Sequence, residues 1–299
     1  MHTPSGTSLP VVPAALAPVL PSARLAGAGA PVFVGAGIRD AAEFLPGLES
    51  LSPVGEHAAW LHGALLGPYS ADITRCLGLA REVGGPVLDL GCGAGRLAVP
   101  FARHGFEVEA VDRDPDCLER LGAWGRRTGP QVSARLATTR ADLASLRLRR
   151  AYRLALLAGA MVCAVPPAAR PGLLAEVAGH LAPGGVLALD YTAHRLRGLA
   201  EDPRRTWAFQ VPRFDGVEEW AVARQVFDLE DMSERITYYS VRTGKRSSER
   251  VVLTTDKWIV DPARLTAELH AAGLRVERRS RHRLDERTES VFLVCRAAG

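Results

Sequence analysis

A glycine-rich turn between a short apolar strand and a helix constrains this chain more than any other feature of its sequence. Residues 87–96 read VLDLGCGAGR, with a predicted strand at 87–90 and glycines at 91, 93 and 95. Glycines let a ligand touch the backbone, and the N–H groups that open the following helix face whatever lies above the strand. The turn therefore predicts an α/β protein that binds a ligand at the carboxyl ends of its strands.

Strands and helices alternate regularly after this turn. The expected strands are 86–90, 106–112, 134–139, 152–158 and 186–191, and the expected helices are 94–103, 115–126 and 168–181. This alternation is typical of βαβ units and a parallel sheet. Residues 204–258 instead alternate Thr, Tyr and Val with charged residues, which predicts antiparallel strands. A helix that starts at Asp261, followed by strands 274–279 and 290–295, then resumes the first sheet.

The glycine spacing disfavours two common phosphate-binding loops. A dinucleotide fold requires GxGxxG and a P-loop requires GxxxxGK[ST], whereas this turn reads GxGxG. Asp112 ends the next strand, where a carboxylate can accept both hydroxyls of a ribose. An Asp-Leu pair at 142–143 precedes the fourth strand, and LAPGG at 181–185 leads into the fifth. The four features together predict a ligand that contains ribose and is not held by a phosphate cradle.

With these motifs the sequence resembles the class I S-adenosylmethionine-dependent methyltransferases, specifically over 86–192 and in general layout over 261–299. The resemblance implies an α/β, Rossmann-like sheet of seven strands whose last strand is antiparallel. It also implies S-adenosylmethionine as cofactor and S-adenosylhomocysteine as product. The residues implied to bind the cofactor are Asp89, Gly91, Cys92, Gly93, Gly95, Arg96, Asp112, Arg113, Asp142, Leu143 and Ala158.

The resemblance implies a role for most of these residues. Asp89, Gly91 and Gly93 are implied to contact the methionyl part. Asp112 is implied to contact the ribose hydroxyls, and residues 142–143 the adenine. The carbonyl of Ala158 lies near the ligand amine, and Arg113 lies along the adenine.

Alternative readings stay open for four of the residues. Arg96 binds the methionine carboxylate or only braces the loop, and Asp142 binds the adenine or caps a helix. Asp112 could be a solvated carboxylate at a strand end. Cys92 is expected to pack as a small buried side chain, since no paired His or Asp motif accompanies it.

The same patterns divide the chain into five segments. We expect a disordered or strap-like tail, a helical N-terminal cover, the cofactor-binding core, a β-rich substrate lid and a C-terminal completion of the core sheet. Their bounds are 1–36, 37–83, 84–203, 204–258 and 259–299.

Departures of this sequence from the motifs of known methyltransferase subtypes narrow the class of acceptor. Enzymes that methylate adenine or glutamine carry (D/N)PP(Y/F) at the end of the fourth strand, where this chain has Ala158 followed by Gly-Ala-Met. Ala158 also cannot ligate magnesium, so we expect no metal. The expected reaction is methyl transfer to an amine of a small molecule or peptide in natural-product biosynthesis. A looser resemblance is to the daptide-type methyltransferases of ribosomal-peptide pathways. The alternatives are an O-methyltransferase or RNA methyltransferase of the same fold, and a non-catalytic interaction protein that binds the cofactor.

Candidate catalytic residues lie on the predicted acceptor side. A sulfonium is a strong electrophile, so catalysis requires mostly alignment of a neutral nucleophile and a group that removes a proton. The predicted catalytic residues are Tyr191, His194 and Tyr238, with Tyr69 and Tyr239 as further candidates. Trp220, Tyr238 and Tyr239 are expected to line part of an apolar acceptor pocket. The alternative is that they pack against each other as the core of segment 204–258.

Composition bounds the location and the partners. The net charge is +4, but the 37 basic residues are mixed with 33 acidic ones, which makes nucleic acid an unlikely partner. Five cysteines without a CxxC pair argue against a disulfide framework or a zinc site. The chain has no apolar run of the roughly 18 to 20 residues that a membrane helix needs. We expect a cytoplasmic protein, and the sequence does not indicate its oligomeric state.

Overall fold

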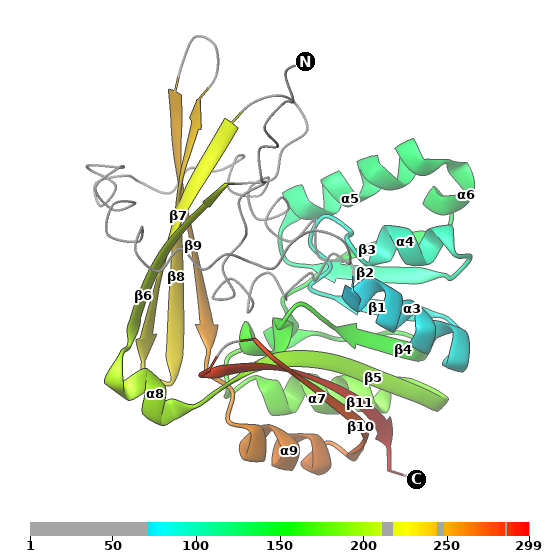
Figure 1. Ribbon diagram of the computed structural model, residues 1–299. Coiled ribbons are helices and arrows are strands. Elements are labelled where there is room, and N and C mark those ends of the chain that lie inside the picture. The colour runs from blue at the N-terminus through cyan, green and yellow to red at the C-terminus, as the bar shows by residue number, and fades with distance from the viewer. Residues whose placement is uncertain (1–70, 211–217, 244–247, 285, 299) are drawn as a thin grey trace, which may run out of the picture.

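The computed structural model describes residues 71–210, 218–243, 248–284 and 286–298 of the 299-residue chain (Figure 1). Two sheets make up this part of the protein, one of seven strands and one of four. The predictions for the tail at 1–36, for helices before residue 71 and for Tyr69 lie outside the described residues.

The seven-stranded sheet has the strand order β10-β11-β5-β4-β1-β2-β3. Neighbouring strands among β1 to β5 are parallel, whereas β11 is antiparallel to both β5 and β10. This confirms the predicted Rossmann-like sheet with an antiparallel last strand. The strands are β1 (Val87–Leu90), β2 (Val108–Asp112), β3 (Leu136–Arg140), β4 (Tyr152–Leu157), β5 (Leu181–His194), β10 (Leu274–Arg283) and β11 (Thr288–Ala297).

Helices cover both faces of this sheet (Figure 1). On one face α3 (Ala71–Val83), α4 (Ala98–Arg103) and α5 (Pro115–Thr128) share an apolar core with β1 and β2. On the other face α7 (Arg170–Gly179) and α9 (Pro262–Ala271) pack in a second core. Short elements complete the chain: α6 (Pro130–Ser133), α8 (Leu196–Glu201) and the single turns η3 (Leu143–Ser145) and η4 (Met161–Cys163).

Local chemistry fixes where these helices begin. Asp114 accepts a hydrogen bond from the Asp116 N–H at 2.9 Å, and Asp261 accepts one from the Ala263 N–H at 2.8 Å. Each Asp is followed by a proline, which has no N–H to leave unpaired at the start of a helix. The two carboxylates therefore cap α5 and α9 close to the predicted starts.

Two element bounds differ from the prediction. The helix after the glycine turn begins at Ala98 rather than at residue 94, because Gly95 has a φ of +92° that no right-handed helix accommodates. Strand β5 begins at Leu181 rather than at residue 186, because Leu181 already pairs with Tyr152 ahead of a shift in register. The predicted LAPGG turn is thus the irregular first part of a long strand.

The four strands of the second sheet are all antiparallel, as the alternation in 204–258 predicts. They run in the order β6-β7-β8-β9, with bounds β6 (Arg204–Gln210), β7 (Glu218–Asp228), β8 (Ser233–Thr243) and β9 (Ser248–Trp258). Helix α8 links β5 to β6, and Figure 1 shows the second sheet standing on the side where β5 ends. The carboxyl end of β5 therefore leads directly into this sheet.

Candidate active site

The glycine turn after β1 is held by a carboxylate from the neighbouring strand. The backbone N–H of Gly93 donates to Asp112 Oδ2 at 2.8 Å, and the N–H of Asp114 donates to Asp112 Oδ1 at 3.0 Å. Gly93 has a φ of +53°, and no described atom lies within 4 Å of the position that a Cβ would take there. The turn thus presents open backbone beside a half-buried carboxylate, which is the arrangement expected for a ribose contact.

A second carboxylate holds the loop after β4 in the same way. Asp190 in β5 accepts hydrogen bonds from the N–H groups of Gly159 at 2.8 Å and Ala160 at 3.0 Å. Both of these residues have positive φ angles, +74° and +57°, so the loop turns sharply as it leaves β4. Burial raises the pKa of Asp190 to about 6. The ends of β1 and β4 are therefore each fixed by the strand beside them.

Asp89 is the most deeply buried acid of the glycine turn. Asp89 is 3% exposed, and burial raises the pKa of its carboxyl to about 7. The nearby Arg96 charge and a hydrogen bond from the Ala98 N–H lower this pKa in part. Its Oδ2 atom accepts no hydrogen bond from the part of the chain that the structure describes. Buried polar atoms are normally paired, so this oxygen is available to a ligand donor.

Arg96 links the glycine turn to helix α3. Its guanidinium donates to both carboxylate oxygens of Asp72, at 2.7 and 2.6 Å. This bidentate contact favours the bracing role over binding of a methionine carboxylate. Its positive charge also lowers the pKa values of Asp89 and Asp190, so one cation serves three carboxylates.

These features meet the requirements of the predicted cofactor. An oxygen of Asp89 without a hydrogen-bond partner among the described residues and the open space at Gly93 lie on the same turn. Asp112 retains acceptor capacity because each carboxylate oxygen has two lone pairs and uses one here. The residues present therefore fit a ligand with an amine donor and a ribose.

The remaining predicted cofactor residues lie along the same edge of the sheet. Cys92 is buried, and burial raises the pKa of its thiol, which agrees with a packing role. Asp142 caps η3 through the Ala144 N–H at 2.8 Å, while Leu143 is buried in the α7 core. The structure places Ala158 in the core directly after β4.

Gly91, Gly95 and Arg113 complete this set. A Cβ on Gly91 would meet the side chain of Met161 at 2.5 Å, and one on Gly95 would meet Leu121 at 2.8 Å. These glycines therefore allow close packing under the turn, whereas Gly93 faces open space. The side chain of Arg113 is exposed.

The three predicted catalytic residues are not brought together. Tyr191 packs in the core on the α7 and α9 side, and burial raises its pKa. His194 ends β5 with its side chain 3% exposed, Nε2 lying 3.7 Å from Glu234 Oε2 and the ring edge-on to Phe227 at 5.2 Å. Tyr238 is fully buried in the second sheet, and burial followed by the nearby Glu234 charge raises its pKa well above the usual range. His194 and Tyr238 thus share Glu234 as a neighbour, while Tyr191 lies apart.

The expectation that Tyr238 and Tyr239 line one pocket is wrong. Adjacent residues of a strand point to opposite faces of its sheet. Along β8 the residues Glu234, Ile236 and Tyr238 are buried, whereas Tyr239 is only half-buried on the other face. The side chain of Trp220 lies outside the described residues.

Sequence reasoning missed three acids that organise the site. Asp72 binds Arg96, Asp190 holds the loop after β4, and Glu234 lies beside His194. Only Asp190 carried a signal, because it lies in an otherwise apolar strand at 186–191. Glu234 lies in a stretch with many charges, where a buried acid cannot be told from an exposed one. Asp72 lies in the first turn of α3, where an acid is common on an exposed helix as well.

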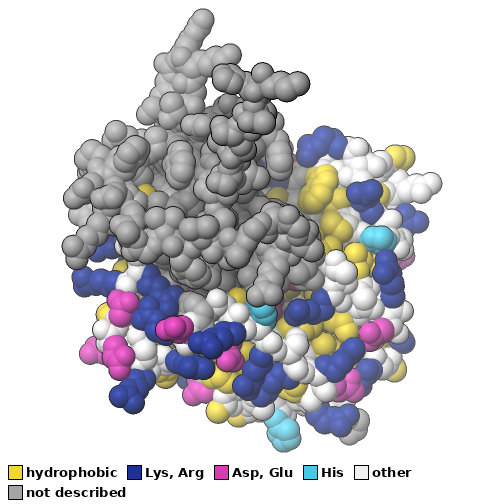
Figure 2. All heavy atoms as spheres, in the orientation of Figure 1, with side chains coloured by type: hydrophobic (Ala, Val, Ile, Leu, Met, Phe, Trp, Pro, Cys, Tyr) yellow, Lys and Arg dark blue, Asp and Glu magenta, His cyan; other side chains and the backbone are white. Residues whose placement is uncertain are grey.

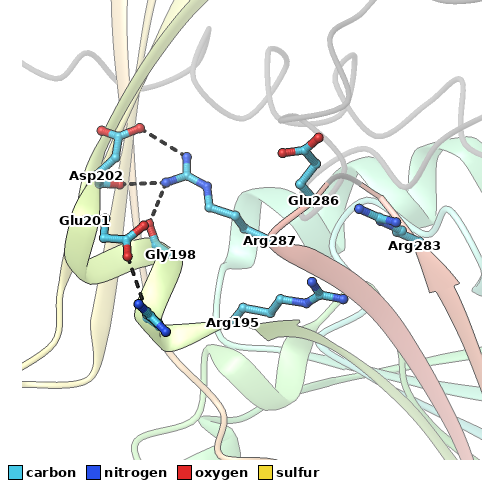
Figure 3. Close-up of a pocket in the computed structure, with 8 residues that line it drawn as sticks. Arg195, Gly198, Glu201, Asp202, Arg283, Glu286 and Arg287 are labelled. Atoms are coloured by element: carbon cyan, nitrogen blue, oxygen red, sulfur yellow. Dashed lines mark hydrogen bonds and ion pairs between the residues drawn. The ribbon is translucent and has the colours of Figure 1, made fainter.

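A charged cavity of about 600 Å³ lies between α8 and the turn that joins β10 to β11 (Figure 3). Its arginines are partly paired with acids of the cavity itself: Arg287 donates to Asp202 and Arg197 lies near Glu201. Figure 2 likewise shows basic side chains spread over the described surface with acidic ones among them. The lining residues are Arg195, Arg197, Gly198, Glu201, Asp202, Arg283, Glu286 and Arg287.

Within the described ranges, no group of three His, Cys, Asp or Glu residues could hold a metal ion. No helix among those ranges is both long and apolar enough to cross a membrane.

Comparison with known proteins identifies the domain. Residues 87–185 match the model of a methyltransferase domain. No curated protein sequence matches the chain.

Solved structures share the fold at low sequence identity. An S-adenosylmethionine-dependent methyltransferase from Clostridium acetobutylicum is 15% identical with a TM-score of 0.61, over 87% of this chain and 98% of that one. CalS10, an amino pentose methyltransferase from Micromonospora echinaspora, is 19% identical with a TM-score of 0.60, over 89% of this chain and 99% of that one. The glycopeptide N-methyltransferase MtfA, in complex with S-adenosylmethionine, is 22% identical with a TM-score of 0.54, over 76% and 87%.

Proposed function

We propose that this chain, an S-adenosylmethionine-dependent methyltransferase of the class I fold, methylates an amine of a small molecule or peptide in natural-product biosynthesis. The contact between Gly93 N–H and Asp112 carries the cofactor assignment, because it fixes an acidic strand end beside an open glycine turn. A dinucleotide-binding turn also uses an acidic strand end for its ribose, so the GxGxG spacing, which lacks the last glycine of GxGxxG, is what argues against a phosphate-binding loop.

The cofactor would lie along the edge formed by β4, β1 and β2. Asp89, Gly91 and Gly93 would hold the methionyl part and Asp112 the ribose. Residues 142–143 would hold the adenine, with Arg113 alongside and Ala158 contributing its carbonyl, while Cys92, Gly95 and Arg96 would shape and brace the turn. When bound, the cofactor supplies an electrophilic methyl group.

The protein then has to align a neutral amine with that methyl group. His194 is the best-placed proton acceptor, because its ring ends the strand whose Asp190 fixes the loop after β4. The imidazole would take one proton from the ammonium form of the acceptor, which frees the amine lone pair for methylation. Tyr238 would act on the acceptor side, and Tyr191 would support β5 from the core.

The amine acceptor is favoured by the neighbours and by the second sheet. Two proteins of the same fold act on amino sugars or glycopeptides, according to their descriptions as an amino pentose methyltransferase and a glycopeptide N-methyltransferase. Residues 204–258 would serve as the substrate lid, since the sheet stands where β5 ends (Figure 1). A hydroxyl acceptor on the same fold is the alternative.

Calorimetric titration tests the cofactor assignment. S-adenosylhomocysteine should bind and NAD should not, and a hundredfold excess of ligand over Kd should raise the free energy of unfolding by about 2.7 kcal/mol. Equal binding of both ligands would refute the assignment. Mass spectrometry of matched amine and alcohol acceptors incubated with S-adenosylmethionine tests the acceptor class, with a gain of one or two methylene units expected on amines alone.

A further inference from the structure

The buried face of the second sheet carries a group of polar side chains. Glu234 and Tyr238 of β8 and Gln225 of β7 are 4%, 0% and 1% exposed. Gln225 Nε2 donates to Glu234 Oε2 at 3.0 Å, and the Glu234 charge reaches the Tyr238 hydroxyl strongly enough to contribute to its raised pKa. These three side chains, which we term the Glu234 cluster, therefore share one face of β7 and β8.

Two atoms of the Glu234 cluster are buried without a hydrogen bond to any residue that the structure describes. These are the hydroxyl oxygen of Tyr238 and Oε1 of Gln225. Native proteins pair nearly all such atoms, because an unpaired one loses its contacts with water and gains nothing in return. A phenylalanine in place of Tyr238 and a leucine in place of Gln225 would fill the same space without a polar atom to pair. The polar atoms therefore indicate a ligand.

The charge of the cluster indicates which ligand. A buried carboxylate needs a positively charged neighbour. Among the described residues, the cation-forming group within 4 Å of Glu234 is the His194 imidazole at 3.7 Å, which is charged only when protonated. Lys257 is opposite Glu234 in the register of β8 and β9, yet the structure gives no ion pair between the two. An ammonium group has three N–H donors and no acceptor, and the cluster offers three kinds of oxygen acceptor.

The cluster also lies next to the predicted methyl-transfer site. His194, which lies beside Glu234, ends β5, and the same strand contains Asp190. Asp190 in turn holds the loop after β4. A group bound at Glu234 is therefore close to the edge where the cofactor would lie.

We propose that Glu234 binds the ammonium group of the methyl acceptor, with Gln225 Oε1 and the Tyr238 hydroxyl as further acceptors of its N–H bonds. The inference rests on the proposed function, since it names the residues that recognise the amine. It assigns to β7 and β8 the choice between an amine and an alcohol, while the core sheet binds the cofactor.

Ligand titrations followed by NMR test this assignment on the full chain saturated with S-adenosylhomocysteine. The probes are phenethylamine, which is protonated at neutral pH, and phenethyl alcohol, its uncharged counterpart. The amine should bind the unaltered protein at least about tenfold more tightly than the alcohol. Glu234→Gln should lose about tenfold in amine affinity and nothing in alcohol affinity. Glu230→Gln, in the exposed β7–β8 turn, is the matched control and should change neither.

Tyr238→Phe gives a second measure that does not remove a buried charge. If the Tyr238 hydroxyl has only a structural role, Tyr238→Phe leaves the amine affinity unchanged. If the hydroxyl binds the ammonium group, the amine affinity falls while the melting temperature stays the same or rises. Equal binding of amine and alcohol, or amine affinities of both cluster variants equal to that of Glu230→Gln, would overturn the assignment. Should Glu234→Gln fail to fold, Tyr238→Phe decides alone. Failure of S-adenosylhomocysteine to bind the unaltered protein would instead refute the proposed function.

Discussion

Replacing Asp89 by Asn should remove a loss of stability that the protein suffers as pH rises. The Asp89 residue is 3% exposed, and burial raises the pKa of its carboxyl from an ordinary value of 3.8 to about 7. The folded protein therefore keeps a proton at this site in a pH range where the unfolded chain has released it. Asn mimics the protonated, uncharged form at every pH.

The sign and size follow from proton linkage. Below about pH 4 both states are protonated, so the favourable contribution of the neutral carboxyl is fully present. Between about pH 4 and 7 only the folded state holds the proton, and the free energy of unfolding falls by up to about 1.4 kcal/mol per pH unit. The loss is complete above about pH 7 and amounts to about 4 kcal/mol at most.

Urea denaturation of the unaltered protein and of Asp89→Asn from about pH 5 to about pH 8 measures this effect. The stability of the variant relative to the unaltered protein should rise by about 2–3 kcal/mol between pH 5 and 7 and then level off. Asp190 has a pKa raised to about 6, but it is present in both proteins and its contribution cancels in the difference. Asp231→Asn, in an exposed turn, is the control. Parallel pH profiles for Asp89→Asn and the unaltered protein would refute the reasoning.

Two further variants test the contacts of the glycine turn. Asp112→Ala should weaken binding of S-adenosylhomocysteine by about 1.5–3 kcal/mol for each charge-assisted hydrogen bond lost, with the circular dichroism spectrum kept, and calorimetry showing unchanged affinity would leave Asp112 no part in ligand binding. Arg96→Ala leaves Asp72, whose side chain is 8% exposed, without its bidentate partner, and should lower the free energy of unfolding by about 3–5 kcal/mol in urea. Arg278→Ala breaks the exposed pair with Glu82 and should cost less than about 1 kcal/mol, so equal losses in the two arginine variants would contradict the difference in burial.

Much of the core could be predicted from the sequence because its signals are local. The strand at 87–90, the glycines of the turn and the caps at Asp114 and Asp261 each depend on residues a few positions apart. Strand and helix periods then leave few topologies for a chain of alternating elements. The sequence alone therefore predicts the class of the fold and the glycine turn at the carboxyl end of β1.

The tertiary structure alone decided which acids organise the site. Asp190 meets Gly159 across 31 positions of the chain, and Arg96 meets Asp72 across 24. Such contacts depend on which strands become neighbours and on which side a helix packs, and one residue of shift in register would turn a side chain to the other face.

The second sheet shows most clearly which features the sequence predicts and which only the tertiary structure decides. Alternation along 235–241 predicted a strand, but not that Glu234 and Tyr238 would be buried while Tyr239 lies on the opposite face. Nor could it place Glu234 beside His194, because that contact joins two different sheets. A strand can be recognised from its own residues, whereas the burial of a charge is set by what packs against it, and only the assembled chain determines that.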